Sequence, residues 1–367
     1  MDRITVRGTP LARGRQYGQQ AQRQIRSALE RYRGLFARRA GLDWDDAAAH
    51  ALGFVADIES FAPDSLLEMR GIAEGAGVPF ETILVLNCRS ELMFAATSRR
   101  GTVPPSECTS FAVTPAASAD GHVLVGQNWD WVPFAREIAV QLEVLRDDKP
   151  SYMTIVEAGM LAKVGVNAAG LGLCTNTLVS SEDAGQRGVP YHVLLRALLD
   201  VASVDEAARC LGSTRRALSA NYLVADRGGS AANFETTAGG AGEIRITRPQ
   251  AGRLAHANHF LDPGFARIDA FVGHAQHSLT RLDAMARGLA EPSPLSVARL
   301  QAILRGHDHA PNGVCSHPDP AADPFYARCT VASIIADLTA GDVWFTDGPP
   351  CTSVYRSYRL PDPDARP

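Results

Sequence analysis

Cys108 is the residue whose type and position offer the most chemistry in this chain. It stands in Ser106-Glu107-Cys108-Thr109-Ser110-Phe111, directly after a run of small residues and prolines at 101–105 that is typical of an exposed loop. Cleavage of the peptide bond before Cys108 would place a thiol and an α-amino group on one residue. The unperturbed pKa is about 8.5 for the thiol and about 7.7–8.0 for the amine. The amine can therefore serve as the base for its own side chain.

Asp130 is the second candidate for chemistry. It follows Cys108 by 22 positions, at the end of the next strand-like run, 121–131. A hairpin of two strands would bring its carboxylate back beside the thiol, where it can hold an α-amino group and tune its proton affinity. The alternative is a solvated aspartate in a turn. Trp129 and Trp131 are expected either to line a pocket for an acyl group or to pack on a wide strand face.

The elements before Cys108 are predicted to be helices. Apolar residues recur at helical spacing within 17–40. Ser65 and Glu68 have the spacing of a capping box that opens a second helix. A third helix is expected over 82–94, where Arg89 and Glu91 are predicted to pair.

The elements after Cys108 are predicted to be mainly strands, interrupted by three helices. The helices are expected to begin at Pro190, after Ser203 and near Pro294. Because helices and strands come in blocks, the pattern favours an α+β or layered sandwich over a doubly wound parallel sheet. Alternation of apolar and polar residues predicts the strands at 138–144, 152–156, 171–177, 221–225, 243–247, 331–335 and 342–345.

Composition sets limits on the class of protein. The 367 residues are 46% hydrophobic and 21% charged, as in an ordinary globular protein, and the net charge is −4. We therefore expect neither nucleic acid nor a membrane as a partner. The chain starts without an apolar signal segment, and no window approaches 18 apolar residues. Seven scattered cysteines without a C-x-x-C pair predict free thiols and a cytoplasmic location. The oligomeric state stays open.

The stretches Glu107-Cys108-Thr109-Ser110-Phe111 and Gly126-Gln127-Asn128-Trp129-Asp130-Trp131 resemble the penicillin acyltransferase family, the acyl-coenzyme A:6-aminopenicillanic acid acyltransferase type of N-terminal-nucleophile hydrolase. The ordered set of motifs is more specific than any single motif. Five further stretches fit in the expected order: Leu86-Asn87-Cys88-Arg89-Ser90-Glu91, Gly165-Val166-Asn167-Ala168-Ala169-Gly170-Leu171 leading to Asn176, Ala257-Asn258-His259-Phe260-Leu261, Thr330-Val331-Ala332-Ser333 and Gly348-Pro349-Pro350.

The resemblance implies a four-layer αββα sandwich with a helical N-terminal segment. It also implies a precursor that cuts itself between Glu107 and Cys108. The products would be a helical α subunit, 1–107, and a catalytic β subunit, 108–367, which stay associated. Cys108 would attack a linear, non-peptide amide and form an acyl-thioester, with no cofactor and no metal. Water would then take the acyl group; an amine would take it in the alternative, an acyltransferase that uses a coenzyme A thioester or an amide.

The resemblance also implies roles for other polar residues. Asn258 is predicted to donate to the oxyanion, and Asn176 to contact the substrate or the amine of Cys108. Gln127 and its neighbour Asn128 are expected to support or position the substrate. Arg281 resembles a family arginine near the site. For each of them the alternative is an ordinary structural role, since asparagine is common in turns and arginine on exposed helix faces.

One departure concerns the substrate. Val314-Cys315-Ser316-His317 stands where the family often has arginine after cysteine. Recognition of a carboxylate of the 6-aminopenicillanic acid type therefore does not carry over. Candidate substrates are N-acyl amino acids, other small acyl amides and penicillin-like amides.

Two rival interpretations remain. One is a processed but inactive homologue that serves as a binding protein. The other is a metal site, because zinc ligands cluster within about two dozen residues, although their spacing matches no standard finger. A serine hydrolase is excluded at the motif level, since the chain has no G-x-S-x-G. The clustered ligands are His307, His309, Cys315, His317 and Cys329.

Overall fold

The computed structural model describes residues 1–99, 107–183, 185–240, 243–271, 276–321, 323 and 327–360. The predicted loop at 101–105 lies outside the described residues, as does the end of the chain, 361–367.

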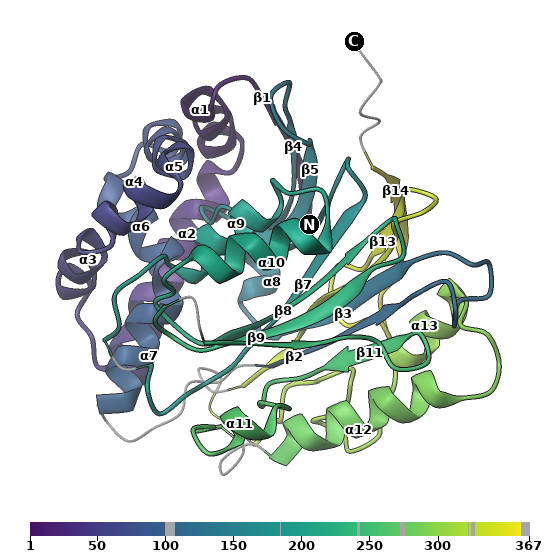
Figure 1. Ribbon diagram of the computed structural model, residues 1–367. Helices are drawn as coiled ribbons and strands as arrows, with labels where there is room; N and C mark the ends of the chain where they lie inside the picture. Colours follow the sequence, from purple (N-terminus) through teal and green to yellow (C-terminus); the bar gives the residue numbers. More distant parts are fainter. Residues whose placement is uncertain are drawn as a thin grey trace.

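Two β-sheets form the middle of the molecule (Figure 1). Neighbouring strands pair antiparallel, with the exception of β1, which runs parallel to β4. The larger sheet, sheet A, has the order β1 (Asp2–Arg7), β4 (Ala139–Leu145), β5 (Tyr152–Glu157), β6 (Val164–Asn167), β7 (Leu171–Thr177), β8 (Ala220–Asp226), β9 (Ala231–Thr236) and β10 (Ile244–Thr247). Sheet B has the order β11 (Arg253–His256), β2 (Glu107–Val113), β3 (Leu124–Trp131), β12 (Cys329–Asp337), β13 (Asp342–Phe345) and β14 (Arg356–Arg359).

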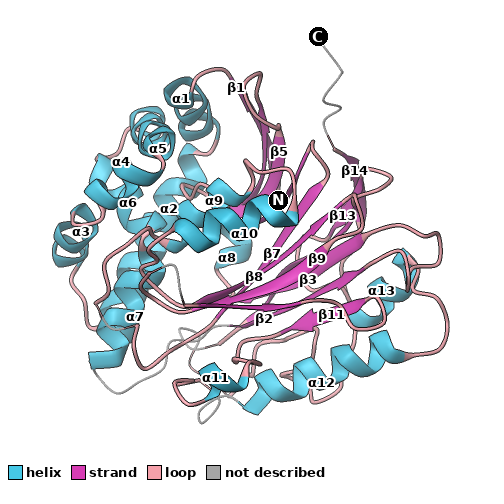
Figure 2. Cartoon of the chain, in the orientation of Figure 1, coloured by secondary structure: helices cyan, strands magenta, loops and turns pink. Residues whose placement is uncertain are grey.

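Helices cover the outer face of each sheet (Figure 2). On sheet B, α12 (Gln276–Ala290) packs against β2 and β11, and α13 (Val297–Leu304) packs against β3 and β12. On sheet A, α10 (Val204–Ser213) packs against β8 and β9. The inner faces meet where β2 and β3 contact β7. The arrangement is the four-layer αββα sandwich that the resemblance implied. The remaining helices of this part are α8 (Ala135–Ile138), α9 (Tyr191–Leu198) and α11 (Pro263–Ala266).

The N-terminal segment is largely helical, as predicted, and is joined to sheet A by a strand that the prediction missed. β1 places Ile4 and Val6 in the core beside β4, while Thr5 between them is half-buried and Arg3 and Arg7 are exposed. Alternation over so few residues was too short a signal to separate from a loop. The segment continues with α1 (Pro10–Gln20), α2 (Gln22–Leu35), the π-helical turn η1 (Phe36–Ala40), α3 (Trp44–Leu52), α4 (Val55–Phe61), α5 (Pro63–Ala76), α6 (Phe80–Asn87) and α7 (Arg89–Arg99).

Two details of the helix predictions were wrong. Ser65 lies inside α5, whose first residue is Pro63, so it is not the cap. The helix expected over 82–94 is two helices, α6 and α7, separated at Cys88. By contrast, the hydroxyl of Ser203 accepts from the backbone N–H of Glu206 and caps α10 as expected.

A buried apolar core fills the space between the sheets and under the N-terminal helices. Ile25 and Tyr32 of α2 belong to the same core as Val140 and Ile155 of sheet A. Residues before Cys108 therefore depend on those after it for their burial. Among the described residues, no helix combines the length and the apolar character that a membrane span requires.

Candidate active site

The hairpin of β2 and β3 places Cys108 and Asp130 next to each other along one ladder. Cys108 is directly opposite Trp129, and Glu107 is directly opposite Asp130. The predicted hairpin is therefore confirmed, and it brings Asp130 to the ladder position next to Cys108, although the Asp130 side chain belongs to the other face of the sheet. The peptide bond between Glu107 and Cys108 lies within the first residues of β2.

The thiol of Cys108 belongs to the face of sheet B that meets sheet A. Alternate residues of a strand share a face, as do residues directly opposite each other, so Cys108, Ser110, Gln127 and Trp129 lie on the same side. Ser110 Oγ donates to Asn176 Oδ1 of β7 at 2.7 Å. This contact identifies the shared side as the inner one, and Cys108 is only 5% exposed there.

Side chains, rather than a neighbouring strand, form hydrogen bonds with the backbone N–H and C=O groups of Cys108. β11 pairs with β2 only from Ser110 onward. At Cys108 the N–H donates to Asn258 Oδ1 at 2.7 Å. The carbonyl oxygen accepts from Arg281 Nη1 at 2.7 Å and from Asn176 Nδ2 at 3.1 Å. Three residues that the sequence singled out, Asn176, Asn258 and Arg281, thus converge on the backbone of one residue.

Arg281 reaches the site from α12 and is fully buried. Besides the carbonyl of Cys108, its guanidinium binds Thr109 Oγ1 at 2.8 Å and Asn258 Oδ1 at 3.0 Å. The backbone N–H of Asn258 in turn donates to Ser278 Oγ of the same helix at 2.8 Å. The alternative of a solvated helix arginine is therefore wrong.

The amide groups of Asn258 and Asn176 contact backbone atoms in this structure. Asn258 Nδ2 donates to the carbonyl oxygen of Thr177 at 2.9 Å, while its Oδ1 faces Cys108. Its donation to an oxyanion stays a prediction. Asn176 contacts the carbonyl oxygen of Cys108 instead of its nitrogen.

Asp130 and Asn128 lie on the outer face of β3, away from the thiol, because they alternate with Trp129. Asp130 Oδ1 accepts from Thr330 Oγ1 at 2.6 Å. Asn128 Nδ2 donates to the carbonyl oxygens of Leu304 and Val314 at 2.9 and 2.8 Å, which ties β3 to the end of α13. Asn128 therefore supports the sheet and does not face the thiol.

Gln127 and Trp129 occupy the inner face beside Cys108. Gln127 Oε1 accepts from the backbone N–H of Thr175 at 2.8 Å and so links the two sheets. Trp129 is buried, with the ammonium of Lys163 4.7 Å from its ring centroid. The ring therefore packs in the core next to Cys108, as one of the two predictions had it. Its lining of a pocket for an acyl group stays a prediction.

Lys163 is the residue that the sequence prediction missed. It precedes β6, is 5% exposed, and its ammonium lies over Trp129 and, at 5.9 Å, over Trp131. Burial and the nearby Arg89 lower the pKa of Lys163 to about 8. The available signal was a lysine at 163 between the apolar residues Ala162 and Val164. An apolar stretch of this kind predicts burial, and lysine is rarely buried without a function or a partner.

Some groups around the thiol raise the pKa of Cys108 and others lower it. Burial dominates and raises the pKa of Cys108 to about 11, with a smaller contribution from the charge of Asp130. Lys163 and Arg281 act in the opposite direction and favour the thiolate. At neutral pH the thiol is therefore protonated at rest, and a base would be needed to make it a nucleophile.

A buried ion pair supports this region from the side of sheet A. Arg89 Nη2 donates to Glu157 Oε2 at 2.8 Å, and both side chains are buried. The guanidinium also lies 4.6 Å from the ring centroid of Trp131. The predicted pairing of Arg89 with Glu91 is wrong, since Glu91 Oε1 instead accepts from the backbone N–H of Tyr191 at 2.7 Å.

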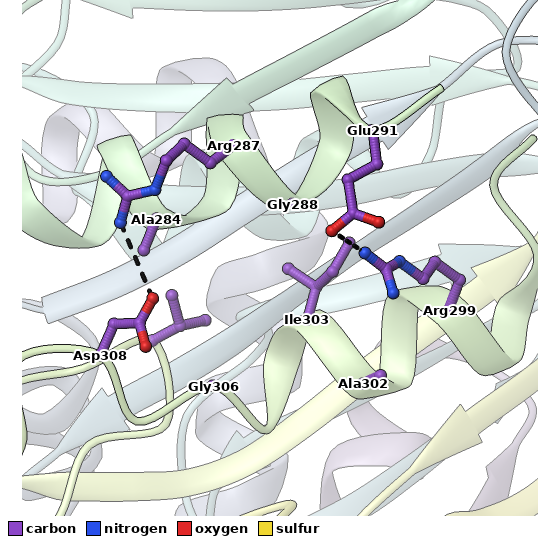
Figure 3. Close-up of a pocket in the computed structure, with 10 residues that line it drawn as sticks. Ala284, Arg287, Gly288, Glu291, Arg299, Ala302, Ile303, Gly306 and Asp308 are labelled. Atoms are coloured by element: carbon purple, nitrogen blue, oxygen red, sulfur yellow. Dashed lines mark ion pairs between the residues drawn. The ribbon is translucent and has the colours of Figure 1, made fainter. Parts of the chain in front are cut away.

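A pocket of about 400 Å³ lies elsewhere, between α12 and α13 (Figure 3). Its lining includes Arg287, Glu291 and Arg299, and it includes neither Cys108 nor the side chains around it. We therefore do not assign it to the chemistry of Cys108.

Comparisons with known proteins agree with the resemblance. A family model described as acyl-coenzyme A:6-aminopenicillanic acid acyl-transferase matches residues 117–328, more than half of the chain. The acyl-coenzyme A:6-aminopenicillanic-acid-acyltransferase 40 kDa form of Emericella nidulans is 27% identical over 266 residues, covering 70% of this chain and 69% of that protein.

Two further similarities are more limited. A glutamate racemase of Pseudomonas putida is 28% identical over 194 residues, covering 48% of this chain and 73% of the racemase. Among solved structures, a variant of conjugated bile acid hydrolase from Clostridium perfringens matches with a TM-score of 0.46 and 15% identity, covering 70% of this chain and 98% of that one.

Proposed function

Because this chain belongs to the acyl-coenzyme A:6-aminopenicillanic acid acyl-transferase family, we propose that it cleaves itself before Cys108 and then hydrolyses an N-acyl amide through a thioester on that residue. The observation that carries the proposal is the set of buried side chains around Cys108. Asn258 holds its N–H, and Arg281 and Asn176 hold its carbonyl oxygen. This arrangement fixes the nucleophile before any substrate arrives.

In the first step the thiol of Cys108 attacks the carbonyl carbon of Glu107. The thiol gives up its proton, the carbon–nitrogen bond breaks, and the nitrogen of Cys108 leaves with a proton as an α-amine. Water then hydrolyses the resulting thioester, which restores the thiol and leaves a carboxylate on Glu107. The α-amine does not exist before this step, so a different base must take the first proton.

Lys163 is the base that we assign to this step. Its ammonium lies over Trp129, the residue directly opposite Cys108. A pKa of about 8 leaves part of the lysine neutral near pH 7 and able to accept a proton. Once it is protonated, the lysine also stabilises the thiolate by its charge.

After cleavage the α-amine takes over as base. Asn258 Oδ1, which already accepts from this nitrogen, would hold the amine in place. Arg281 adjoins Asn258 Oδ1, and its positive charge disfavours a second positive charge on the amine. The amine is therefore kept neutral and can accept the proton of its own thiol.

The acyl group of the substrate would then pass to Cys108 and onward to water. The amine shuttles the thiol proton to the leaving nitrogen, and a water molecule breaks the thioester. Asn258 or Asn176 would supply an amide N–H to the oxyanion, a contact that is typically worth about 2.7–4 kcal/mol. Asp130, whose Oδ1 is held by Thr330, would support the amine from the neighbouring ladder position.

The two products of self-cleavage are expected to stay together. Fragment 1–107 contributes β1 to sheet A, and apolar residues of its helices belong to the main core. Size-exclusion chromatography of the matured protein should therefore give one peak that contains both fragments. Two separate peaks without denaturant would contradict this expectation.

The second candidate function is acyl transfer. It is favoured by the similarity of this chain to the Emericella nidulans protein, which is named an acyltransferase. A panel of N-acyl amides tested with and without acyl-coenzyme A thioesters distinguishes the two. Release of the amine from an amide without thioester supports hydrolysis. Turnover that requires the thioester supports transfer. No turnover in either arm by a fully matured protein, with Cys108 unlabelled by a thiol-directed acyl analogue, supports the inactive homologue.

A further inference from the structure

Four side chains that can bind a metal ion meet at the end of α13. The Nε2 atoms of His307 and His317 are 3.1 Å apart. His317 Nε2 also lies 3.6 Å from Cys315 Sγ and 3.3 Å from Cys351 Sγ. All four ligand atoms lie within 4.8 Å of one another.

These distances fit a four-coordinate zinc ion. With Zn–S bonds of about 2.3 Å and Zn–N bonds of about 2.0–2.1 Å, tetrahedral angles place neighbouring ligand atoms roughly 3.3–3.8 Å apart. The nitrogen–nitrogen and sulfur–nitrogen separations here lie close to that range. Two thiolates and two imidazoles are also a donor set that zinc prefers over magnesium or calcium.

The set of metal ligands predicted from the sequence was only partly correct. His309 and Cys329 do not join the group, and the distant Cys351 does. Cys351 reaches the group from the turn after β13, where Arg305 Nε binds the carbonyl oxygen of Pro350 at 2.9 Å. Sequence spacing could not reveal this residue, because it is 34 positions beyond His317.

The loop that carries the other three ligands is fixed by its backbone. The N–H of Cys315 donates to the carbonyl oxygen of Gly306 at 2.9 Å, and that of His317 donates to Pro311 at 3.0 Å. A Cβ at Gly313 would lie 2.9 Å from the carbonyl oxygen of Asp308, so only glycine fits this close passage.

The neighbouring carboxylate is turned away from the four ligands. Asp308 Oδ2 faces Arg287 at 3.7 Å, on the side of the pocket between α12 and α13 (Figure 3). His307, the preceding residue, is therefore the member of this turn that faces Cys315 and His317.

We propose that His307, Cys315, His317 and Cys351 bind one zinc ion in a closed structural site. Four protein ligands leave no open position for a water or a substrate, so the ion would hold the chain rather than act in the reaction. It would join the loop after α13 to the turn after β13.

The site would also steady Asp130 from a distance. Ser316, between two of the ligands, makes two hydrogen bonds with Thr330. Its N–H donates to the Thr330 hydroxyl Oγ1 at 2.9 Å, and its carbonyl oxygen accepts from the backbone N–H of Thr330 at 3.0 Å. Thr330 Oγ1 in turn donates to Asp130 Oδ1 at 2.6 Å. The metal thus fixes the segment on which the orientation of Asp130 depends.

The first test uses the wild-type full-length protein, purified with reductant and without chelator. Elemental analysis should find about one equivalent of zinc per chain. Replacement of the metal by Co²⁺ should produce the visible d–d bands of a tetrahedral site and the near-ultraviolet thiolate-to-cobalt band. This second measurement needs no variant and so does not depend on whether a mutant folds.

Variants then assign the ligands. Cys351→Ser removes a ligand from a half-buried turn and should abolish the thiolate band or reduce it to about half, and lower the zinc content of the dialysed protein. Matched controls are Cys210→Ser, a thiol outside the group, and His309→Asn, a nearby histidine in a left-handed conformation that asparagine tolerates. Both controls should retain the wild-type spectrum and zinc content.

Three results would overturn the proposal. The first is less than about 0.1 equivalent of zinc after incubation with the metal, together with no cobalt bands. The second is a Cys315–Cys351 disulfide in protein kept under reductant, which would make the pair a redox couple. The third is an unchanged cobalt spectrum in Cys351→Ser.

Discussion

Arg281 follows Cys108 by 173 positions, and its guanidinium donates to the backbone carbonyl oxygen of that residue at 2.7 Å. The same guanidinium binds Asn258 Oδ1, which accepts from the N–H of Cys108. One fully buried cation therefore fixes both backbone polar groups of the proposed nucleophile. Within the part of the chain that the structure describes, Arg281 donates hydrogen bonds to neutral oxygen atoms of Cys108, Thr109 and Asn258, so its charge remains available to the site.

Replacement of Arg281 tests its effect on the amine. Arg281→Met should lower the turnover of matured protein about 10²-fold, because the carbonyl of Cys108 and Asn258 both lose a partner. The loss of positive charge should also raise the pKa of the α-amine and move the acidic limb of the kcat/KM profile to higher pH. Arg281→Lys should recover the position of the limb without the full rate. A drop in rate with an unmoved limb would indicate a purely structural role.

Substitutions of Lys163 distinguish a general base from a residue that acts only through its positive charge. Lys163→Met should slow self-cleavage by roughly 10²–10⁴-fold, the usual contribution of a general base. Lys163→Arg keeps the charge and loses the ability to accept a proton near neutral pH, so it should be nearly as slow. The measurement is the decay of full-length chain after refolding, followed by mass. If Lys163→Arg cleaves at the wild-type rate, the lysine acts only through its charge.

The pH dependence of self-cleavage follows from the lowered pKa of Lys163. A base must be neutral, and the neutral fraction of the lysine rises as the pH increases through about 8. The cleavage rate should therefore rise about tenfold per pH unit below pH 8 and level off above it. A rate that is flat between pH 6 and pH 9 in the wild type would exclude this base.

The layers and most of the elements were predictable because they rest on local signals. β7 and β13 match the predicted ranges 171–177 and 342–345, and α10 begins where Ser203 predicts a cap. β1 was missed because a strand of so few residues is defined by its parallel partner β4, far away in sequence. Parallel pairing of this kind leaves no turn signal in the chain.

The site was predictable where residues carry a recognisable motif, and less so where contacts cross between elements. The motifs led to Cys108, Asn258 and Arg281, which the structure brings together. Lys163 has no motif, and its relation to Cys108 depends on how sheet A faces sheet B. The hydrogen-bond partners of the Asn176 and Asn258 side chains could not be predicted from the sequence either, because they depend on side-chain orientation.

The pair of Arg89 and Glu157 should contribute strongly to stability. Arg89→Met would leave the Glu157 carboxylate buried without its partner, which typically costs about 3–5 kcal/mol. The exposed pair of Arg31 and Glu137 provides the matched control, and Arg31→Met should cost less than about 1 kcal/mol. Urea unfolding of the Cys108→Ala chain measures both changes on uncut protein. Equal costs for the two substitutions would contradict the account.

The most direct test of the central claim is the intact mass of freshly purified protein, with Cys108→Ala measured beside it. The account predicts two fragments in the wild type, 1–107 and 108–367, and a single chain in the variant. A single full-length mass in both would mean that Cys108 keeps its peptide bond and has no free amine. That result would contradict the proposed mechanism while leaving the αββα fold unchanged.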